Sequence, residues 1–359
     1  MTDKPDIRSD HAITATDLQV LVDESTYAGV TSFLRRPYRK DLSEADVAVV
    51  GVPFDTATTN RPGTRFGPRG IRTASTDLAF QKLVYGWDFH PVNELKIVDH
   101  GDLPFDFTRP ARVPDEIEQY TAWMLDQNVT VLALGGDHFI SWPLIKAHSI
   151  KHGKPISMIH FDAHSDTWPD EHDDGISHGT MFWHATRQGY LDPATSVQIG
   201  LRTVNQDTMG FNILDGPWVQ RHGTDAVIEE IRRIVGDNKV YLTFDIDCLD
   251  PAYAPGTGTP VCGGLTPARP VRSSKDCPVS MSSAPIWSKW HRPTTTRKSR
   301  PSPARPWPSI SCACSPARRN ATTDLEPAAV GPDSWPQGLH RSGDRHSAGQ
   351  RNNRATKLQ

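Results

Sequence analysis

The sequence predicts an α/β fold of three layers, in which a doubly wound parallel sheet lies between two layers of helices. Six short apolar runs are almost continuous rather than alternating, which is typical of strands buried on both faces. Segments with helical spacing separate these runs, and such alternation predicts parallel strands joined by helical crossovers. The expected strands cover residues 47–54, 95–101, 129–138, 156–164, 196–202 and 239–247.

Two segments between the expected strands have the pattern of amphipathic helices. Residues 224–235 begin at Thr224, a residue type that caps helix N-termini, and repeat apolar residues at helical spacing. Residues 114–127 begin with acidic residues and carry four large side chains on one face, Ile117, Tyr120, Met124 and Leu125. Both segments therefore predict helices that cover the sheet.

The composition changes near residue 267. Residues 1–266 contain 23 Lys and Arg against 37 Asp and Glu, whereas residues 267–359 contain 16 against 5. The latter part also holds 13 of the 30 prolines and contains no Phe or Tyr. Such a segment cannot bury enough apolar surface to fold alone. We expect an N-terminal extension at 1–30, a folded domain at 31–266 and a disordered tail at 267–359.

Several classes of protein are disfavoured. No apolar run is long enough to cross a membrane, and the polar N-terminus does not resemble a signal peptide. The five cysteines form no disulfide pattern, which indicates a reducing compartment and predicts a cytoplasmic protein. The basic tail could bind nucleic acid, but its charges are scattered and lack grouped aromatic residues, so a nucleic-acid partner is not expected.

Clusters of Asp and His follow three of the expected strands. Because ligands bind outside the carboxyl ends of parallel strands, these side chains are expected to meet. Carboxylates with some imidazole suit Mn²⁺ and similar divalent ions, and six ligands suit two ions that share carboxylates. Each motif alone has another interpretation, such as a helix cap or a core histidine. The six candidate ligands are His138, Asp162, His164, Asp166, Asp245 and Asp247.

Three motifs resemble the signatures of the ureohydrolase superfamily, which includes arginases and agmatinases. They are GGDHFIS (135–141), HFDAHSDTW (160–168) and TFDIDCLDPAYAPGTGTPVCGGLT (243–266), and the resemblance covers about residues 30–266. Within the superfamily, GVPFDTATTNRPGTRFGPRGIR (51–72), SHGTMFW (177–183) and GTGTPVCGGLT (256–266) resemble agmatinases most.

This resemblance implies an arginase-like fold, a homo-oligomer and two Mn²⁺ ions that support hydrolysis of a guanidinium group to urea and an amine. The implied substrate is agmatine, with putrescine as the second product; 4-guanidinobutyrate and arginine are alternatives. The implied ligands form two overlapping sets that share Asp162 and Asp245. One set is His138, Asp162, Asp166 and Asp245, and the other is Asp162, His164, Asp245 and Asp247.

The resemblance also suggests residues that act on the substrate. His178 resembles the proton-shuttle histidine of the family, although a loop histidine without a role is the alternative. His172 and His184 match no pattern and are expected to be ordinary. The acidic loop at 168–177, with Asp170, suits a substrate with a free cationic end, unless it is merely solvated. Asn60, in an Asn-Arg-Pro-Gly turn, could line the entrance to the site.

The family pattern next predicts a buried strand that ends in a phrase like VEVAPPYD, whose Glu contacts the guanidinium. No such phrase occurs in residues 267–359, and Lys289 stands where the Glu is expected. Reading the codons of residues 284–301 one base early permits GADMVEVAPPYDHAEITA, with Glu over Lys289. We therefore hypothesise a frameshift soon after Thr266. A metal-binding protein without turnover is the alternative to an active enzyme.

Overall fold

The computed structural model describes residues 11–12, 24–81, 83, 89–172 and 174–268, and the backbone of 281–283. These residues belong to a compact unit at Met1–Ser315, while a second unit, Pro316–Gln359, lies outside them. Most of the expected extension and tail, including Lys289, also lies outside the described residues. The disorder of the tail and the frameshift therefore stay predictions.

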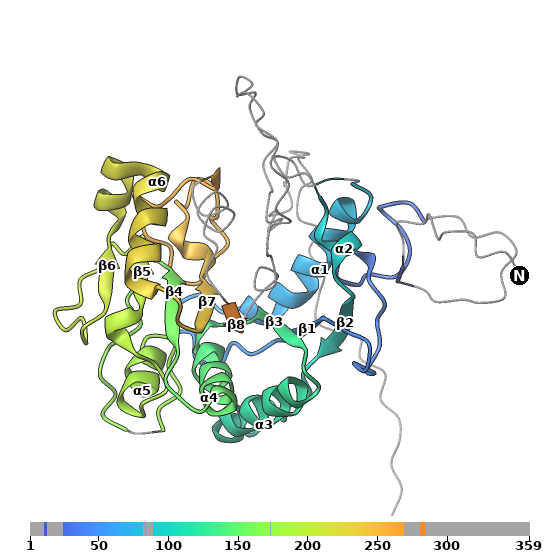
Figure 1. Cartoon of the computed structure of the whole chain (residues 1–359), viewed down its shortest axis with the longest axis horizontal. Coiled ribbons are helices and arrows are strands. Elements are labelled where there is room, and N and C mark those ends of the chain that lie inside the picture. Colours follow the sequence, from blue (N-terminus) through green and yellow to red (C-terminus); the bar gives the residue numbers. More distant parts are fainter. Residues whose placement is uncertain are drawn as a thin grey trace, which may run out of the picture. The chain divides into compact units, whose positions relative to one another are not determined.

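All strand pairs are parallel, and they form two hydrogen-bonded groups with the orders β2-β1-β3 and β6-β5-β4-β7-β8. β8 contacts β3, so the two groups meet there (Figure 1). The strands are β1 (Val47–Val52), β2 (Ile97–Asp102), β3 (Thr130–Gly135), β4 (Ser157–Phe161), β5 (Val197–Ile199), β6 (Asn212–Leu214), β7 (Val240–Phe244) and β8 (Met281–Ser283).

Helices cover both faces of the sheet, with α1, α2 and α6 on one side and α3, α4 and α5 on the other (Figure 1). The expected three-layer α/β/α architecture is thereby confirmed. Burial of every residue of β1 and β4 explains why these strands lack alternation. The helices are α1 (Gly67–Ala79), α2 (Pro91–Glu94), α3 (Val113–Asp126), α4 (Ser141–His152), α5 (Met181–Arg187) and α6 (Gly216–Val235).

All six expected strands are present, and α3 confirms the helix expected at 114–127, with Ile117, Met124 and Leu125 buried. Residues 224–235 form only the second part of α6. This helix begins at Gly216, where the Asp215 carboxylate accepts a hydrogen bond from the amide of Trp218. The non-helical Gly223, with φ of 82°, interrupts α6 just before Thr224, which explains the start signal there.

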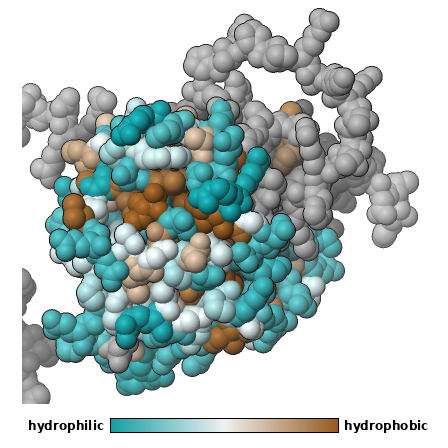
Figure 2. All heavy atoms as spheres, turned by 60° about the vertical axis from the view of Figure 1, so that its left-hand side comes forward, coloured by the Kyte–Doolittle hydropathy of each residue, from teal (hydrophilic) through white to brown (hydrophobic). Residues whose placement is uncertain are grey.

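β6 and β8 were not expected, because each has three residues and neither carries an extended apolar run. The side that carries α5, α6 and β6 is mostly hydrophilic, with apolar residues gathered in patches (Figure 2). Such a surface fits an outer layer of amphipathic helices. Among the described residues, none of the helices combines the length and apolarity needed to span a membrane.

Candidate metal centre

Three segments that follow β3, β4 and β7 bring the six candidate ligands together. His138 begins a 3₁₀ turn (His138–Ile140) after β3, and Asp245 caps another (Ile246–Cys248) after β7. The DAHSD segment, 162–166, follows β4, which pairs directly with β7. Because the strands are parallel, all three segments lie at the same edge of the sheet.

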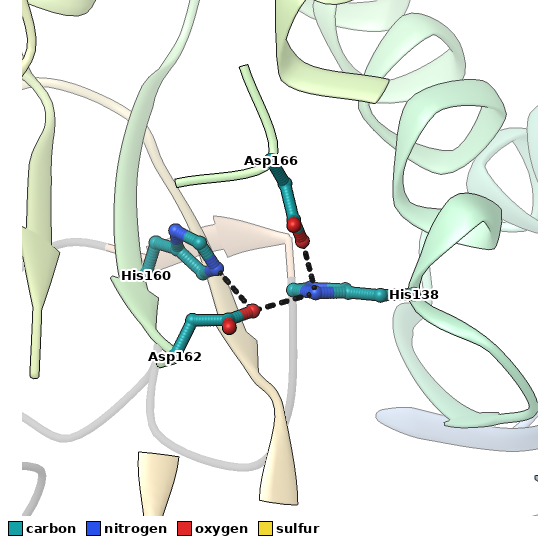
Figure 3. A group of neighbouring side chains, drawn as sticks. All are labelled: His138, His160, Asp162 and Asp166. Atoms are coloured by element: carbon teal, nitrogen blue, oxygen red, sulfur yellow. Dashed lines mark hydrogen bonds and ion pairs between the residues drawn. The ribbon is translucent and has the colours of Figure 1, made fainter. Parts of the chain in front are cut away.

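His138 points its Nδ1 atom at three carboxylates. Nδ1 lies 2.9 Å from an oxygen of Asp162 and 2.9 Å from one of Asp166 (Figure 3). An oxygen of Asp245 is 3.4 Å away. Burial opposes charge on this ring, but the contacts with Asp162 and Asp166 outweigh it and raise the pKa of His138 well above its usual value. The opposite ring atom, Nε2, is fixed 2.7 Å from the Thr243 hydroxyl. A buried imidazole nitrogen that faces several carboxylates, with its other ring nitrogen held by a polar partner, is the arrangement of a metal ligand.

Asp162 joins this group to a second one. Its Oδ1 atom lies 3.3 Å from Nδ1 of His164, and that nitrogen lies 3.1 Å from Oδ2 of Asp247. The ligand atoms of the Asp162, His164 and Asp247 group all lie within 4.8 Å of one another, as do those of His138, His160, Asp162 and Asp166. Two metal-sized donor sets therefore share the carboxylate of Asp162.

Backbone amides fix the carboxylates. The amide of Ala163 donates to Oδ1 of Asp247 at 3.0 Å, and the amide of Asp247 donates to Oδ1 of Asp245 at 2.9 Å. Asp166 adopts a left-handed conformation with φ of 52°, which Asp tolerates better than most residues. Gly136, with φ of 67°, allows close approach of the preceding loop, since a Cβ there would lie 2.3 Å from the carbonyl oxygen of Val52.

The crowding of buried carboxylates perturbs their protonation. Burial, followed by the charge of Asp162, raises the pKa of Asp166 to about 7. Burial and the charges of Asp162 and Asp245 raise the pKa of Asp247 to about 8. Burial opposes charge on the ring of His164, but hydrogen bonds to Asp162 and Asp247 outweigh it and raise its pKa to about 10. Divalent cations would remove the need for these protons.

A pocket of about 320 Å³ opens beside the cluster. His178 lines it, and the hydroxyl of Thr59 lies 2.8 Å from Nε2 of His178. Burial and the charges of His138 and His164 lower the pKa of His178, which favours its neutral ring. The lining residues are Thr59, His164, Asp166, Trp168, Ser177, His178, Gly179, Thr180, Asp245, Asp247 and Thr259.

The two candidate substrate contacts do not line this pocket. Asn60 is exposed and follows Thr59, which does line it. Asp170 is turned toward His184, whose Nε2 lies 2.9 Å from its carboxylate. His184 is buried and stacks on Trp142 with ring centroids 4.5 Å apart, whereas His172 is exposed. This placement gives Asp170 a structural partner.

Several residues at the site escaped the analysis of motifs. His160 is buried and lies 2.8 Å from Asp162, and its place two residues before Asp162 in HFDAHSD was the only signal. Thr59 and Trp168 line the pocket but carry no distinctive pattern. Arg202 donates hydrogen bonds to backbone carbonyls on both sides of the loop after β7, including those of Asp247 and Val261. These roles depend on contacts between residues that are far apart in the sequence.

The donor set of carboxylate oxygens and imidazole nitrogens suits Mn²⁺ and other divalent ions of intermediate softness. The buried Nδ1 of His138, which faces three carboxylates, and the raised pKa values of Asp166 and Asp247 are what a metal-free form of such a site should show. Cys248 follows Asp247 and is buried, but among the described residues it belongs to neither group of candidate ligand atoms. The residues present therefore fit a divalent metal centre.

Comparison with known proteins agrees with the fold. The sequence pattern of the Arginase family matches residues 45–276. An agmatinase of Chromobacterium violaceum is 50% identical over 266 residues, which cover 74% of this chain and 82% of that protein. An agmatinase of Photorhabdus laumondii is 45% identical over 252 residues, covering 70% and 81%.

Solved structures give the same result. The crystal structure of a hypothetical agmatinase from Burkholderia thailandensis matches with a TM-score of 0.73 and 48% identity, covering 77% of this chain and 87% of that one. Proclavaminate amidino hydrolase from Streptomyces clavuligerus matches with a TM-score of 0.65 and 32% identity, covering 74% and 92%. The three-layer α/β/α fold, together with a His and Asp cluster that could hold a metal ion, defines a hydrolase. The chain belongs to the arginase family and is a ureohydrolase.

Proposed function

We propose that the chain hydrolyses agmatine to putrescine and urea with two Mn²⁺ ions. The observation that carries this proposal is the pair of donor groups that share Asp162 beside a pocket containing His178. Its agmatinase relatives, one of them 50% identical, support the substrate. The division into an extension, a catalytic domain at 31–266 and a tail, the homo-oligomer and the cytoplasmic location stay predictions from the sequence.

Each ion would be held by four side chains, and Asp162 and Asp245 would contribute to both. When bound, the two ions would supply Lewis acidity, which activates water as a nucleophile at neutral pH. The remaining ligands would be His138 and Asp166 for one ion, and His164 and Asp247 for the other. The distances around Nδ1 of His138 and Nδ1 of His164 support this division.

His178 is the side chain best placed to protonate the departing amine. Its Nε2 accepts hydrogen bonds from the amide of Thr59 at 3.2 Å and from the Thr59 hydroxyl. The neutral ring therefore carries its proton on Nδ1. An amine leaves only with a proton, and the N–H of a neutral imidazole is too weak an acid to give one. His178 would therefore act as a proton shuttle, in which the ring first takes up a second proton and the resulting imidazolium then protonates the departing amine.

The pocket favours a guanidine without a carboxylate. Among the described residues that line it, none is Lys or Arg, so neither an ammonium nor a guanidinium group faces a carboxylate of arginine or 4-guanidinobutyrate. The half-buried Trp168 supplies an aromatic surface, which can attract the cationic amine of agmatine. These two features favour agmatine over its carboxylated analogues.

Urea release by the Mn²⁺-loaded full chain tests the proposal. We expect turnover of agmatine and little turnover of 4-guanidinobutyrate or arginine at equal concentrations. Asp166→Asn, which removes a ligand, should abolish most of the activity. Release of urea from arginine, but not from agmatine, would overturn the substrate assignment.

A non-catalytic metal-binding protein is the second candidate function. It is favoured because the family match ends at residue 276 and no VEVAPPYD-like phrase follows. Tight Mn²⁺ binding without urea from any of the three guanidines would support it. Sequencing the gene across codons 262–285 distinguishes a frameshift from a genuine C-terminus.

A further inference from the structure

His160 and Gln198 form a buried hydrogen-bonded pair behind Asp162. They lie on neighbouring strands and are direct partners in the register of β4 and β5. Both side chains are fully buried. The amide nitrogen of Gln198 lies 2.6 Å from the carbonyl oxygen of Ser165 and 3.1 Å from Nδ1 of His160. Gln198 therefore connects the histidine ring to the loop between His164 and Asp166.

These contacts determine which nitrogen of His160 carries the proton. The partner of a carbonyl oxygen must be a donor, so the Gln198 atom near Ser165 is the amide nitrogen. The same nitrogen donates to Nδ1 of His160, which must accept. The proton of the neutral ring is consequently on Nε2, which donates to Oδ2 of Asp162 at 2.8 Å.

Asp162 thus receives one fixed N–H donor on each carboxylate oxygen. Nε2 of His160 donates to Oδ2, and the amide of His164 donates to Oδ1 at 2.7 Å. An ionised carboxylate offers about two acceptor sites on each oxygen. One site on Oδ2 remains toward the His138 group (Figure 3), as the 2.9 Å contact shows. One site on Oδ1 remains toward the His164 group.

We propose that His160, held by Gln198, is a positioning residue that orients Asp162 to bridge two metal ions. This inference rests on the metal centre of the proposed function, but not on its substrate. His160 is close enough to His138, Asp162 and Asp166 to be counted as a ligand itself. Its Nε2 proton, directed at Asp162, excludes that role. Phe182 packs against the ring at a centroid distance of 4.7 Å and limits its rotation.

Mn²⁺ titration of the chelator-stripped full chain, by calorimetry and by electron paramagnetic resonance, tests the proposal. Loss of a residue that orients a ligand typically weakens metal affinity about 10- to 100-fold, which we expect for His160→Phe. His160→Gln keeps an N–H donor near the Nε2 position and should recover most of the affinity. Gln198→Met should weaken binding about 10-fold, because the ring loses the donor that fixes its tautomer.

His148 provides a matched control. It is also a buried histidine, on α4, with Nδ1 2.7 Å from the carbonyl oxygen of Leu144 and no contact with the candidate ligands. His148→Phe should leave the Mn²⁺ affinity unchanged. An equal loss of affinity in this variant would mean that general packing is responsible, and would overturn the proposal.

Three further outcomes would also overturn it. His160→Phe or Gln198→Met could bind Mn²⁺ as tightly as the unmodified chain. His160→Gln could lose one ion at saturation, which would make His160 a ligand. The unmodified chain could bind no Mn²⁺, which would remove the ligand assignment as well. If His160→Phe does not fold, the Mn²⁺ affinities of His160→Gln and Gln198→Met test the positioning role instead. Failure to hydrolyse agmatine would contradict the proposed substrate only, because this titration needs none.

Discussion

The hydroxyl of Thr59 holds Nε2 of His178 at 2.8 Å, across 119 residues of chain. This contact joins the loop after β1 to the loop before α5 at the wall of the pocket. It fixes the ring of the candidate general acid from the side opposite its Nδ1 proton. Thr59 therefore explains how a loop histidine can be held in a defined orientation.

Replacing His178 should reduce turnover with little effect on metal binding. General acid catalysis contributes about 10²- to 10⁴-fold, so we expect kcat of His178→Asn to fall by this amount. Thr59→Val keeps the side-chain shape, and its kcat should fall about 10-fold as the ring loses its anchor. The measurement is urea release with Mn²⁺ content checked. His172→Asn, at an exposed histidine nearby, is the control and should be unaffected.

Replacing Asp162 should affect metal binding, whereas replacing Asp170 should affect thermal stability. Asp162→Asn should lose both ions, because its carboxylate belongs to both donor groups. Asp170→Asn should keep them but lower Tm, since it breaks the contact with the buried His184. Metal analysis and thermal denaturation of both variants check this. A raised KM for agmatine with unchanged Tm would instead make Asp170 a substrate contact.

Metal affinity should increase with pH. Asp166 and Asp247 have pKa values raised to about 7 and about 8, so each holds a proton at pH 6 that an ion must displace. An acid whose pKa is raised in the folded state stabilises the metal-free protein at pH values below the pKa that it has when unfolded. This stability is lost as the pH rises through the folded pKa, here about 7 and about 8. Chelation should therefore lower Tm more at pH 8 than at pH 6. Equal shifts at both pH values would contradict the assignment.

Arg202 should stabilise the loop that follows β7. Its guanidinium donates to several backbone carbonyls there, among them that of Asp247 at 2.6 Å. Leaving such acceptors without a partner costs about 1–3 kcal/mol, so Arg202→Met should lower the free energy of unfolding by that order. Denaturant unfolding measures it. Arg233→Met is the control, because Arg233 is an exposed arginine paired with Glu230 on α6 and should change stability little.

Restoring the frame after Thr266 should raise activity. The shifted translation places a Glu over Lys289 within a strand-forming phrase, as the family pattern requires. We expect at least about a 100-fold gain in kcat/KM for agmatine, the effect of a well-placed charged contact to a cationic substrate. The two chains are compared by urea release at equal Mn²⁺ content. Equal activity would show that the tail as written suffices.

The sequence alone determined the fold class, because strands buried on both faces must be continuously apolar and helices between them must be amphipathic. It also identified the six Asp and His residues now found together, since their charges stand directly at strand ends. Their residue types were sufficient to predict a divalent metal. The resemblance of three motifs predicted the family.

Tertiary structure decided the rest. His160 and Gln198 are 38 residues apart, and only the register of β4 with β5 places them side by side. Thr59 reaches His178 only because the loops after β1 and before α5 meet, and Asp170 turns to His184 rather than to the pocket. Periodicity describes which face of an element is buried, but not which side chains from distant elements share a hydrogen bond. That information arises only when the strands are paired in register.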